Sequence, residues 1–404
     1  MTSCISPLIN SAGKHIVTIE GLNMSDLSPV QKVMIDANGT QCGFCTVGFI
    51  VSLSGYCLSE GAASREGGIS AIDGNICRCT GYKSIERATT QLVTLLKGKN
   101  HDDPIAWLVL KGFIPEYFLS IPERLAKIMR IESVSKPTGV LVGGGTDLYV
   151  QQHEYLMESE VENAVTRKLS SAITTTGSRC IVGGATTLTD LLESKIFLEA
   201  FPRLKKHLYL VSSTQIRNMS TLAGNFINAS PIGDLTIFFL ALNATLTMRT
   251  ENGGSRTVPL KNMYKGYKTL DKNEKEYVED IQFDLDKNSR FNFEKVSKRT
   301  NLDIASVNSA IQIKVEGSHI KEVAISAGGV GPIPIFLERT CEFLEGKELS
   351  PETISEAAQV LASETSPISD ARGTKEYKGL LLRQLFYAHF IELFPEIITL
   401  DEVL

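Results

Sequence analysis

The sequence reads Gln41-Cys42-Gly43-Phe44-Cys45 and, further along, Cys77-Arg78-Cys79, and these two stretches decide how the N-terminal part of the chain folds. A CxxC pair places two thiols on one tight turn and a CxC pair places two more on another, so that four sulfurs can meet at one centre. Zinc and a [2Fe-2S] cluster both accept four thiolates. Because a zinc ribbon usually pairs two CxxC turns, the CxC pair favours the cluster; zinc and four buried free cysteines are the alternatives.

Helical patterns surround these cysteines. Ser28 is followed by Pro29 and Gln31, which predicts a helix that begins at residue 29 with a capping box. Further helices are expected over residues 47–58, 69–73 and 85–96. Both cysteine pairs then lie near helix N-termini, where the helix dipole favours the thiolate. Residues 23–98 are therefore predicted to form a small all-helical domain around the metal centre.

The composition is that of an ordinary globular protein. The chain has 404 residues, 43% hydrophobic and 22% charged, which excludes a disordered, collagenous or coiled-coil chain and suggests two or three domains. A net charge of −5 gives no reason to expect a nucleic acid or an anionic membrane as partner. The most apolar stretch, residues 235–248, is too short to span a bilayer. The first residues lack a secretory signal, so we expect a cytoplasmic protein without a disulfide framework.

Two further zones follow the helical one. The polar stretch that begins at Gly98 contains a breaker, Pro104, and residues 99–111 are interpreted as a linker. Residues 112–288 alternate short β-branched runs with helical patterns, which predicts an α+β domain with two βα subdomains. Residues 289–404 begin with strand-like runs and finish with helical patterns, so a second α+β domain, an antiparallel sheet with helices, is expected. The predicted fold class is thus multidomain α+β.

Two glycine-rich turns stand out in the middle zone. The first, residues 141–148, has three consecutive glycines between a short apolar strand and a helical pattern. Its backbone N–H groups can form an anion-binding nest, although such a turn taken alone is about as often only a turn. It matches neither GxGxxG nor a P-loop. The second, residues 181–187, repeats the order of strand, turn and helix, and this repetition favours a ligand-binding role.

The cysteine stretches, together with Gly74-Asn75 and Thr80-Gly81-Tyr82, resemble the helical [2Fe-2S] domain of the molybdenum hydroxylases, the family of xanthine dehydrogenase, aldehyde oxidase and carbon monoxide dehydrogenase. One departure is Val47, where this family usually has proline. Segments of residues 143–147, 216–225 and 230–234 resemble, in that order, the FAD-binding domain of the family. Residues 298–308 and 368–373 resemble the domain that follows it.

The resemblance implies two cofactors. A [2Fe-2S] cluster would be held by Cys42, Cys45, Cys77 and Cys79, and Gly43 and Gly81 would let amides approach its sulfurs. FAD would be wrapped by Leu141, Val142, Gly143, Gly144, Gly145, Thr146, Asp147, Leu148, Thr221, Leu222, Ala223, Gly224 and Asn225. Val211 would contact FAD through its backbone, Asp234 would accept from a ribose hydroxyl, Val278 would lie near the flavin edge, and Lys295 would make a polar contact.

The first residues resemble part of another domain of the same family. Residues 3–8 and the run 15–22 are similar to the last strand of a plant-type ferredoxin domain, so residues 1–22 are expected to be a remnant of it. Cys4 would then be one ligand of a second [2Fe-2S] cluster, which is incomplete because its other ligands are missing from the sequence. We expect the sequence to be truncated at its N-terminus, either as a fragment or through a misplaced start.

The implied function is electron transfer. The order of an iron–sulfur domain before a flavin domain in one chain resembles the small subunit of bacterial xanthine dehydrogenases. Such a chain would pass electrons from a molybdopterin-binding large subunit through [2Fe-2S] to FAD and on to NAD, in xanthine or hypoxanthine oxidation, as part of a hetero-oligomer. We expect no catalytic side chain here, since substrate would be hydroxylated on the partner. A subunit for an aldehyde or another N-heterocycle, and a non-catalytic flavin-binding fragment, are the alternatives.

Overall fold

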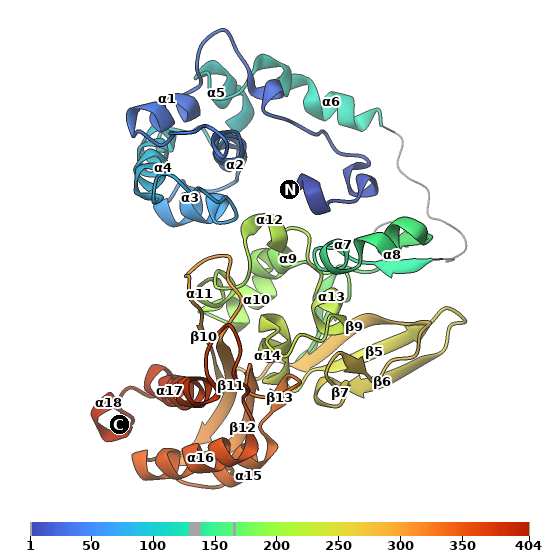
Figure 1. Ribbon diagram of the computed structural model, residues 1–404, viewed down its shortest axis with the longest axis vertical. Helices are drawn as coiled ribbons and strands as arrows, with labels where there is room; N and C mark the ends of the chain where they lie inside the picture. Colours follow the sequence, from blue (N-terminus) through green and yellow to red (C-terminus); the bar gives the residue numbers. More distant parts are fainter. Residues whose placement is uncertain (1, 129–138, 165–166, 404) are drawn as a thin grey trace.

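A computed structural model describes residues 2–128, 139–164 and 167–403 of the chain. Three bodies follow one another along the molecule (Figure 1): a helical body at the N-terminus, a middle body of helices, two sheets and a separate β-hairpin, and a C-terminal body of a sheet and long helices. Each has its own hydrophobic core, and the cores of the last two meet across one sheet. The multidomain α+β prediction is confirmed.

The N-terminal body is built from helices. After short 3-10 turns at Ser3–Ile5, Leu8–Ser11 and Glu20–Leu22, its helices are α1 Pro29–Asp36, α2 Thr46–Leu58, α3 Arg65–Ile72, α4 Lys83–Leu96 and α5 Pro104–Leu110. The capping box at the start of α1 is present, because the Ser28 hydroxyl accepts from the Gln31 amide and the Gln31 side chain accepts from the Ser28 amide. Phe49 and Leu53 of α2 and Leu92 of α4 are fully buried in the core of this body.

Two expectations for this part of the chain are corrected. The predicted linker contains α5: Asp103 caps it by accepting from the Ala106 amide, and Pro104 is its first residue rather than a breaker. Leu108 of α5 is buried in the helical core. The run 15–22, expected as a strand, pairs with no strand in the described residues and ends in a 3-10 turn, since an isolated strand leaves its backbone unpaired.

The middle body begins, after the 3-10 turn Glu116–Ser120 and α6 (Ile121–Ala126), with a small parallel unit. β1 (Val140–Val142) pairs in parallel with β2 (Val161–Asn163), and α7 (Leu148–Gln151) and α8 (His153–Glu158) connect them. The first glycine-rich turn lies between β1 and α7, as the sequence predicts. The N-terminal segment lies beside this unit, where Asn10 accepts a hydrogen bond from Asn163.

The second sheet of the middle body is antiparallel and has the order β3-β4-β9-β5-β6. Its strands are β3 Ile173–Thr176, β4 Arg179–Gly183, β5 Thr245–Thr250, β6 Ser255–Pro259 and β9 Glu276–Asp284; Leu260–Asn262 is a 3-10 turn, and β7 Tyr264–Gly266 with β8 Thr269–Leu270 is a separate hairpin. Its helices are α9 Leu188–Glu193, α10 Lys195–Ala200, α11 Leu204–Leu208, α12 Thr214–Arg217, α13 Leu222–Ile227 and α14 Asp234–Leu240. The second glycine-rich turn connects β4 to α9.

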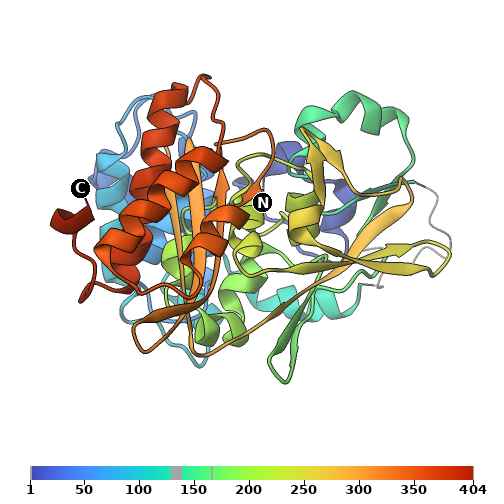
Figure 2. The same ribbon diagram turned by 90° about the horizontal axis from the view of Figure 1, so that it is seen from below.

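The C-terminal body is an antiparallel sheet with helices on both faces. The order is β10 (Ser289–Val296), β11 (Val307–Glu316), β12 (His319–Gly328), β13 (Ile335–Phe336), and the helices are α15 Glu338–Leu344, α16 Pro351–Glu364, α17 Lys375–Leu393 and α18 Leu400–Val403. Figure 2 shows the orange and red helices across this sheet. On the other face α14 packs on β11 and β12, which joins the C-terminal and middle bodies. No helix of the described residues has the length and apolarity to cross a membrane.

Candidate cofactor sites and the contact between them

The four clustered cysteines lie in two close pairs. The sulfurs of Cys42 and Cys79 are 3.5 Å apart, and the thiol of Cys45 hydrogen-bonds that of Cys77. Among the described residues no group of three or more His, Cys, Asp or Glu side chains converges as it would on a single metal ion. Two pairs suit a dinuclear centre, in which each iron takes two thiolates, better than one tetrahedral zinc. The donor set therefore fits a [2Fe-2S] cluster.

The backbone around the cysteines explains their position and their acidity. Gly43 and Gly81 have φ of +84° and +62°, and a Cβ at either would meet open space, so these glycines are required for their left-handed backbone. Cys45 is the N-cap of α2. Burial by itself raises the pKa of the Cys77 thiol, but hydrogen bonds from Thr80 and the Cys79 amide bring it down to about 7. A thiolate is thus accessible at neutral pH, as a metal ligand requires.

The other three thiols differ in their surroundings. A hydrogen bond from the Phe44 amide lowers the pKa of Cys42, with a further contribution from Cys79, whereas the bond to Cys42 raises the pKa of Cys79. Burial raises the pKa of Cys45 to about 11. Cys42 and Cys79 are exposed and the other pair is more enclosed. One pair therefore lies at the protein surface, and exposed apolar side chains lie close to the cysteines in sequence: Phe44 at 90%, Ile76 at 61% and Val47 at 50% exposure.

The first glycine-rich turn offers unused backbone donors. In the part of the chain that the structure describes, none of the N–H groups from Gly143 to Leu148 donates a hydrogen bond within the protein. Gly144 and Gly145 are buried, so these donors are withheld from bulk water. Buried N–H groups in folded proteins nearly always have a partner. A phosphate group would satisfy a run of such donors, so this turn fits the pyrophosphate of FAD.

The second turn is closed. Gly183, Gly184 and Ala185 donate their amides to backbone carbonyls of Ala172, Glu279 and Ser170. The amides of residues 186 and 187 are also taken, by the Gly183 carbonyl and the Asp190 side chain. Although the second turn resembles the first in sequence, the backbone N–H groups of its residues 183–187 are therefore not free to bind a ligand.

The segment 221–225, predicted to wrap FAD, is also tied to its own chain. The amides of Leu222 and Ala223 donate to the carbonyls of Thr186 and Gly184, and the Gly224 amide donates to the Thr221 hydroxyl. The segment thus holds α13 against the second turn. The hydroxyl of Thr186, buried at this junction, has no partner among the described residues and is the polar atom left for a ligand there.

The packing of the protein itself requires glycine at position 144. The expected reason was close approach of a pyrophosphate, but a Cβ at this position would lie 1.8 Å from the Met219 carbonyl oxygen. A Cβ at Gly143 would lie 2.5 Å from the Thr221 hydroxyl. The first turn therefore packs directly on the loop that follows α12, and Met219 in turn accepts from the Ser6 hydroxyl of the N-terminal segment at 3.4 Å.

Asp234 and Lys295 lie together as a buried ion pair. The Lys295 ammonium is 2.7 Å from the Asp234 carboxylate and also donates to the carbonyls of Leu210 and Asp303. Asn308 donates to the other oxygen of Asp234 at 2.6 Å. Burial raises the pKa of Asp234, and the Lys295 charge opposes this. All three ammonium protons of Lys295 are used, so the contacts with ribose and flavin remain predictions for a bound state.

Two valines complete the predicted flavin residues. Val211 is buried between α11 and α12, and Val278 is buried in β9, where its carbonyl lies against Gly184 of the second turn. The carbonyl of Val211 accepts from the Arg217 guanidinium at 2.9 Å. For both residues the contact with FAD stays a prediction.

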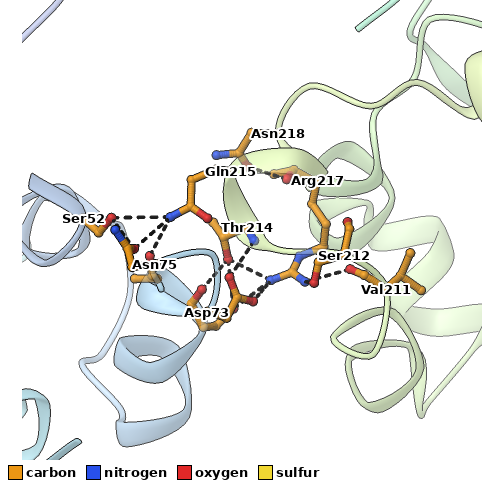
Figure 3. Close-up of polar contacts among 12 residues, drawn as sticks. Ser52, Asp73, Asn75, Val211, Ser212, Thr214, Gln215, Arg217 and Asn218 are labelled. Atoms are coloured by element: carbon orange, nitrogen blue, oxygen red, sulfur yellow. Dashed lines mark hydrogen bonds and ion pairs between the residues drawn. The ribbon is translucent and has the colours of Figure 1, made fainter. Parts of the chain in front are cut away.

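The structure adds a contact that the sequence did not predict. Arg217 of α12 reaches Asp73, at the end of α3, with 2.6 Å between Nη2 and Oδ2 (Figure 3). Thr214 donates its amide to the other carboxylate oxygen at 2.8 Å, and Gln215 donates to the Ala71 carbonyl at 3.1 Å. Arg217 occurs in the Ile-Arg-Asn motif, but nothing in the sequence indicates its partner on another domain.

Comparison with known proteins identifies the family. Residues 18–90 match the family described as [2Fe-2S] binding domain, residues 116–283 the FAD binding domain in molybdopterin dehydrogenase, and residues 293–393 the CO dehydrogenase flavoprotein C-terminal domain. The chain belongs to the molybdenum hydroxylase family. Within this family of oxidoreductases it carries the iron–sulfur and FAD-binding domains.

Relatives in the molybdenum hydroxylase family are longer. Xanthine dehydrogenase 1 of Arabidopsis thaliana is 26% identical over 97% of this chain and 35% of its own length, and aldehyde oxidase 2 of Mus musculus is 25% identical over 98% and 34%. The chain thus spans about a third of the length of these relatives.

Solved structures share the fold of part of the chain. A carbon monoxide dehydrogenase chain of Hydrogenophaga pseudoflava superposes with a TM-score of 0.58, at 24% identity over 61% of this chain and 86% of that chain. Quinoline 2-oxidoreductase of Pseudomonas putida 86 gives a TM-score of 0.55 at 21% identity, also over 61% of this chain and 86% of that chain. At this level of identity the comparison establishes the fold.

Proposed function

We propose that this chain is the electron-transfer subunit of a molybdenum hydroxylase. It would act with a molybdopterin-binding partner chain in a hetero-oligomer and deliver electrons to NAD. The observation that carries the proposal is the pairing, in one chain, of a surface-exposed cysteine pair with a turn whose backbone donors are unused. When bound, a [2Fe-2S] cluster accepts one electron at a time and FAD collects two, which leave as a hydride to NAD⁺.

The residues of this chain would bind and orient the cofactors. Cys42, Cys45, Cys77 and Cys79 hold the cluster, and the amides of residues 143–148 hold the pyrophosphate. The exposed Cys42–Cys79 side would face the partner, together with the exposed apolar residues near it in sequence, Phe44, Ile76 and Val47. Gln41, next to Cys42, would donate and accept hydrogen bonds. Large apolar side chains that are exposed in the isolated chain are typical of a surface that a partner covers.

Xanthine or hypoxanthine is the proposed substrate of the complex, since the curated relatives include xanthine dehydrogenases at 26% and 25% identity. Aldehyde oxidases match at 25%, so an aldehyde or another N-heterocycle is the second candidate. Substrate contacts would lie on the partner. An assay of the complex with hypoxanthine and with an aromatic aldehyde, each with NAD and with oxygen as acceptor, would choose between the two substrates and the two acceptors.

The cofactors are tested first in the isolated chain. We expect a flavin absorbance band together with a broad iron–sulfur band, one FAD and two irons per chain. Cys77→Ser should lose most of the iron or change the EPR signal strongly while FAD stays, because the two sites use different residues. Cys180→Ser is the matched control, since Cys180 is a buried free thiol outside the cluster. Zinc in place of iron under iron-replete growth, or an unchanged cluster in Cys77→Ser, would refute the assignment. A flavin band without iron would favour a flavin-binding fragment.

A further inference from the structure

The contact between the helical and middle bodies contains a buried charged pair. The side chains of Arg217 and Asp73 are 2% and 3% exposed, and their nearest atoms are 2.6 Å apart. Removing two charges from water is unfavourable unless the remaining donors and acceptors are also satisfied. Because this pair is fully buried at a domain boundary, its stability depends on the other hydrogen bonds that the two side chains make.

Arg217 uses its guanidinium on both sides of the boundary (Figure 3). Toward the helical body it donates to Asp73 and to the Ser70 hydroxyl at 3.1 Å. Toward its own body it donates from Nη1 to the carbonyls of Val211 at 2.9 Å and Ser212 at 3.1 Å. A planar guanidinium fixes such a set of acceptors in one orientation, because its donors lie in a rigid fork.

Each side of this contact is close in sequence to a candidate cofactor site: FAD on the Arg217 side and the cluster on the Asp73 side. Ser212 has φ of +49°, a left-handed conformation that a serine adopts only when its surroundings hold it there. Val211, next to it, is the residue proposed to contact FAD through its backbone. On the other side, Asp73 is followed by Gly74, Asn75 and then Cys77 of the cluster. A Cβ at Gly74 would lie 2.0 Å from the Gln215 amide oxygen, so the two bodies meet without a gap here.

We propose that Arg217 is a positioning residue that makes FAD binding depend on the docking of the cluster domain, because Asp73 holds the guanidinium that fixes the Val211 and Ser212 carbonyls. The inference rests on the proposed function, since it requires FAD at Val211. It goes further by assigning to Asp73, a residue of the other domain, an effect on the flavin pocket. The same contact then sets the separation of the two cofactors.

The test is the affinity of the full chain for FAD. We expect Asp73→Asn to weaken FAD binding about tenfold, measured by flavin fluorescence in chain reloaded after FAD removal, and to change the visible circular dichroism of bound flavin at saturating FAD. Arg217→Lys keeps the charge opposite Asp73, but a single ammonium lacks the rigid fork that serves two carbonyls and a carboxylate together. It should weaken FAD binding to a similar degree, and the double variant should be no weaker than Arg217→Lys.

Two matched controls distinguish this effect from a general weakening of the contact between the helical and middle bodies. Gln215→Ala removes bonds across the same boundary, to Ala71 and Asn75, without touching the Val211 and Ser212 carbonyls, and should leave FAD affinity within twofold. Glu86→Gln breaks exposed ion pairs with Arg65 and Lys83 within the helical body and should also have no effect. Far-UV circular dichroism and iron content confirm that each variant is folded and loaded.

The outcomes are distinct. Unchanged FAD affinity in folded Asp73→Asn overturns the inference, and so does an equal loss in Gln215→Ala, which would make the effect one of general docking. If Asp73→Asn fails to fold, Arg217→Lys decides: native FAD affinity and an unchanged flavin signal in that variant overturn the inference. Failure of the wild-type chain to bind FAD at all would instead refute the proposed function, before any variant is compared.

Discussion

The two glycine-rich turns of the middle body look alike in sequence and differ in their hydrogen bonds. Both connect a strand to a short helix, at residues 141–148 and 181–187. In the first, the N–H groups of residues 143–148 have no acceptor in the described part of the chain; in the second, those of residues 183–187 are all taken. The second turn lies at the centre of a sheet-and-helix junction, where neighbouring chain supplies carbonyls. The first lies at the edge of a two-stranded unit that leaves its donors open.

This difference shows how a repeated motif can serve two purposes. The second turn, whose donors are all taken, accepts hydrogen bonds from Leu222 and Ala223 of α13. It thereby stabilises the junction of β4, α9 and α13, which we call the frame. The open turn rests on that frame through the contact of Gly144 with the Met219 backbone. Ligand binding by the open turn should therefore be sensitive to the frame, whereas the frame should be insensitive to changes confined to the donors of the open turn.

Acid should give the largest effect, and it acts away from both turns, where α11, β10 and α17 meet. Burial lowers the pKa of His207 to about 4 and that of His389 to about 3, and the two rings share the Asn292 amide. The unfolded chain takes up these protons near pH 6.5. The stability that the neutral rings contribute is therefore complete above pH 6.5 and falls with pH by about 1.4 kcal/mol per unit for each histidine. Urea unfolding at pH 7, 6 and 5 measures this slope.

If the comparison of the two turns is right, FAD should be released only as the chain loses stability in acid. The donors of the open turn are backbone N–H groups, which do not titrate. His389→Gln should reduce the acid slope by about half. The exposed His101 provides the control, and His101→Gln should unfold with the wild-type slope. FAD lost at a pH where the chain is still fully folded would contradict this view.

Glycine substitution should give the next largest effect and should not distinguish the turns. A Cβ at Gly144 or Gly184 would lie 1.8 Å from the Met219 carbonyl or 2.4 Å from the Val278 carbonyl. Overpacking against backbone of this kind costs about 1–3 kcal/mol. Gly144→Ala and Gly184→Ala should both lower the free energy of unfolding by that order. Gly55→Ala, in α2 with open space around its Cβ, should instead stabilise by about 0.5–1 kcal/mol. Native stability in Gly144→Ala would mean that the packing described here is wrong.

Local signals in the sequence predicted much of the fold and the donor types of both sites. Ser28 and Gln31 cap α1 as predicted, since a capping box involves only near neighbours. The sequence did not reveal which turn was open, because the carbonyls of Ala172, Glu279 and Ser170 come from elsewhere in the chain. The pairing of Arg217 with Asp73 also depends on how two bodies dock. Pro104 was misinterpreted as a breaker because proline opens helices as readily as it ends them.

The smallest expected effect is the one that tests the comparison most directly. Thr146 and Ala185 are both half-buried, one in each turn. Thr146→Asp places a carboxylate beside the open donors, where it competes with a phosphate for them, so FAD affinity should fall about tenfold, or about 1.4 kcal/mol, while stability changes little. Ala185→Asp places the same charge beside donors already taken, so it should lower stability without changing FAD affinity in the folded protein. Fluorescence titration with FAD and urea unfolding measure the two quantities. Equal loss of FAD affinity in both variants would mean that repulsion by charge alone, and not the open donors, accounts for the result.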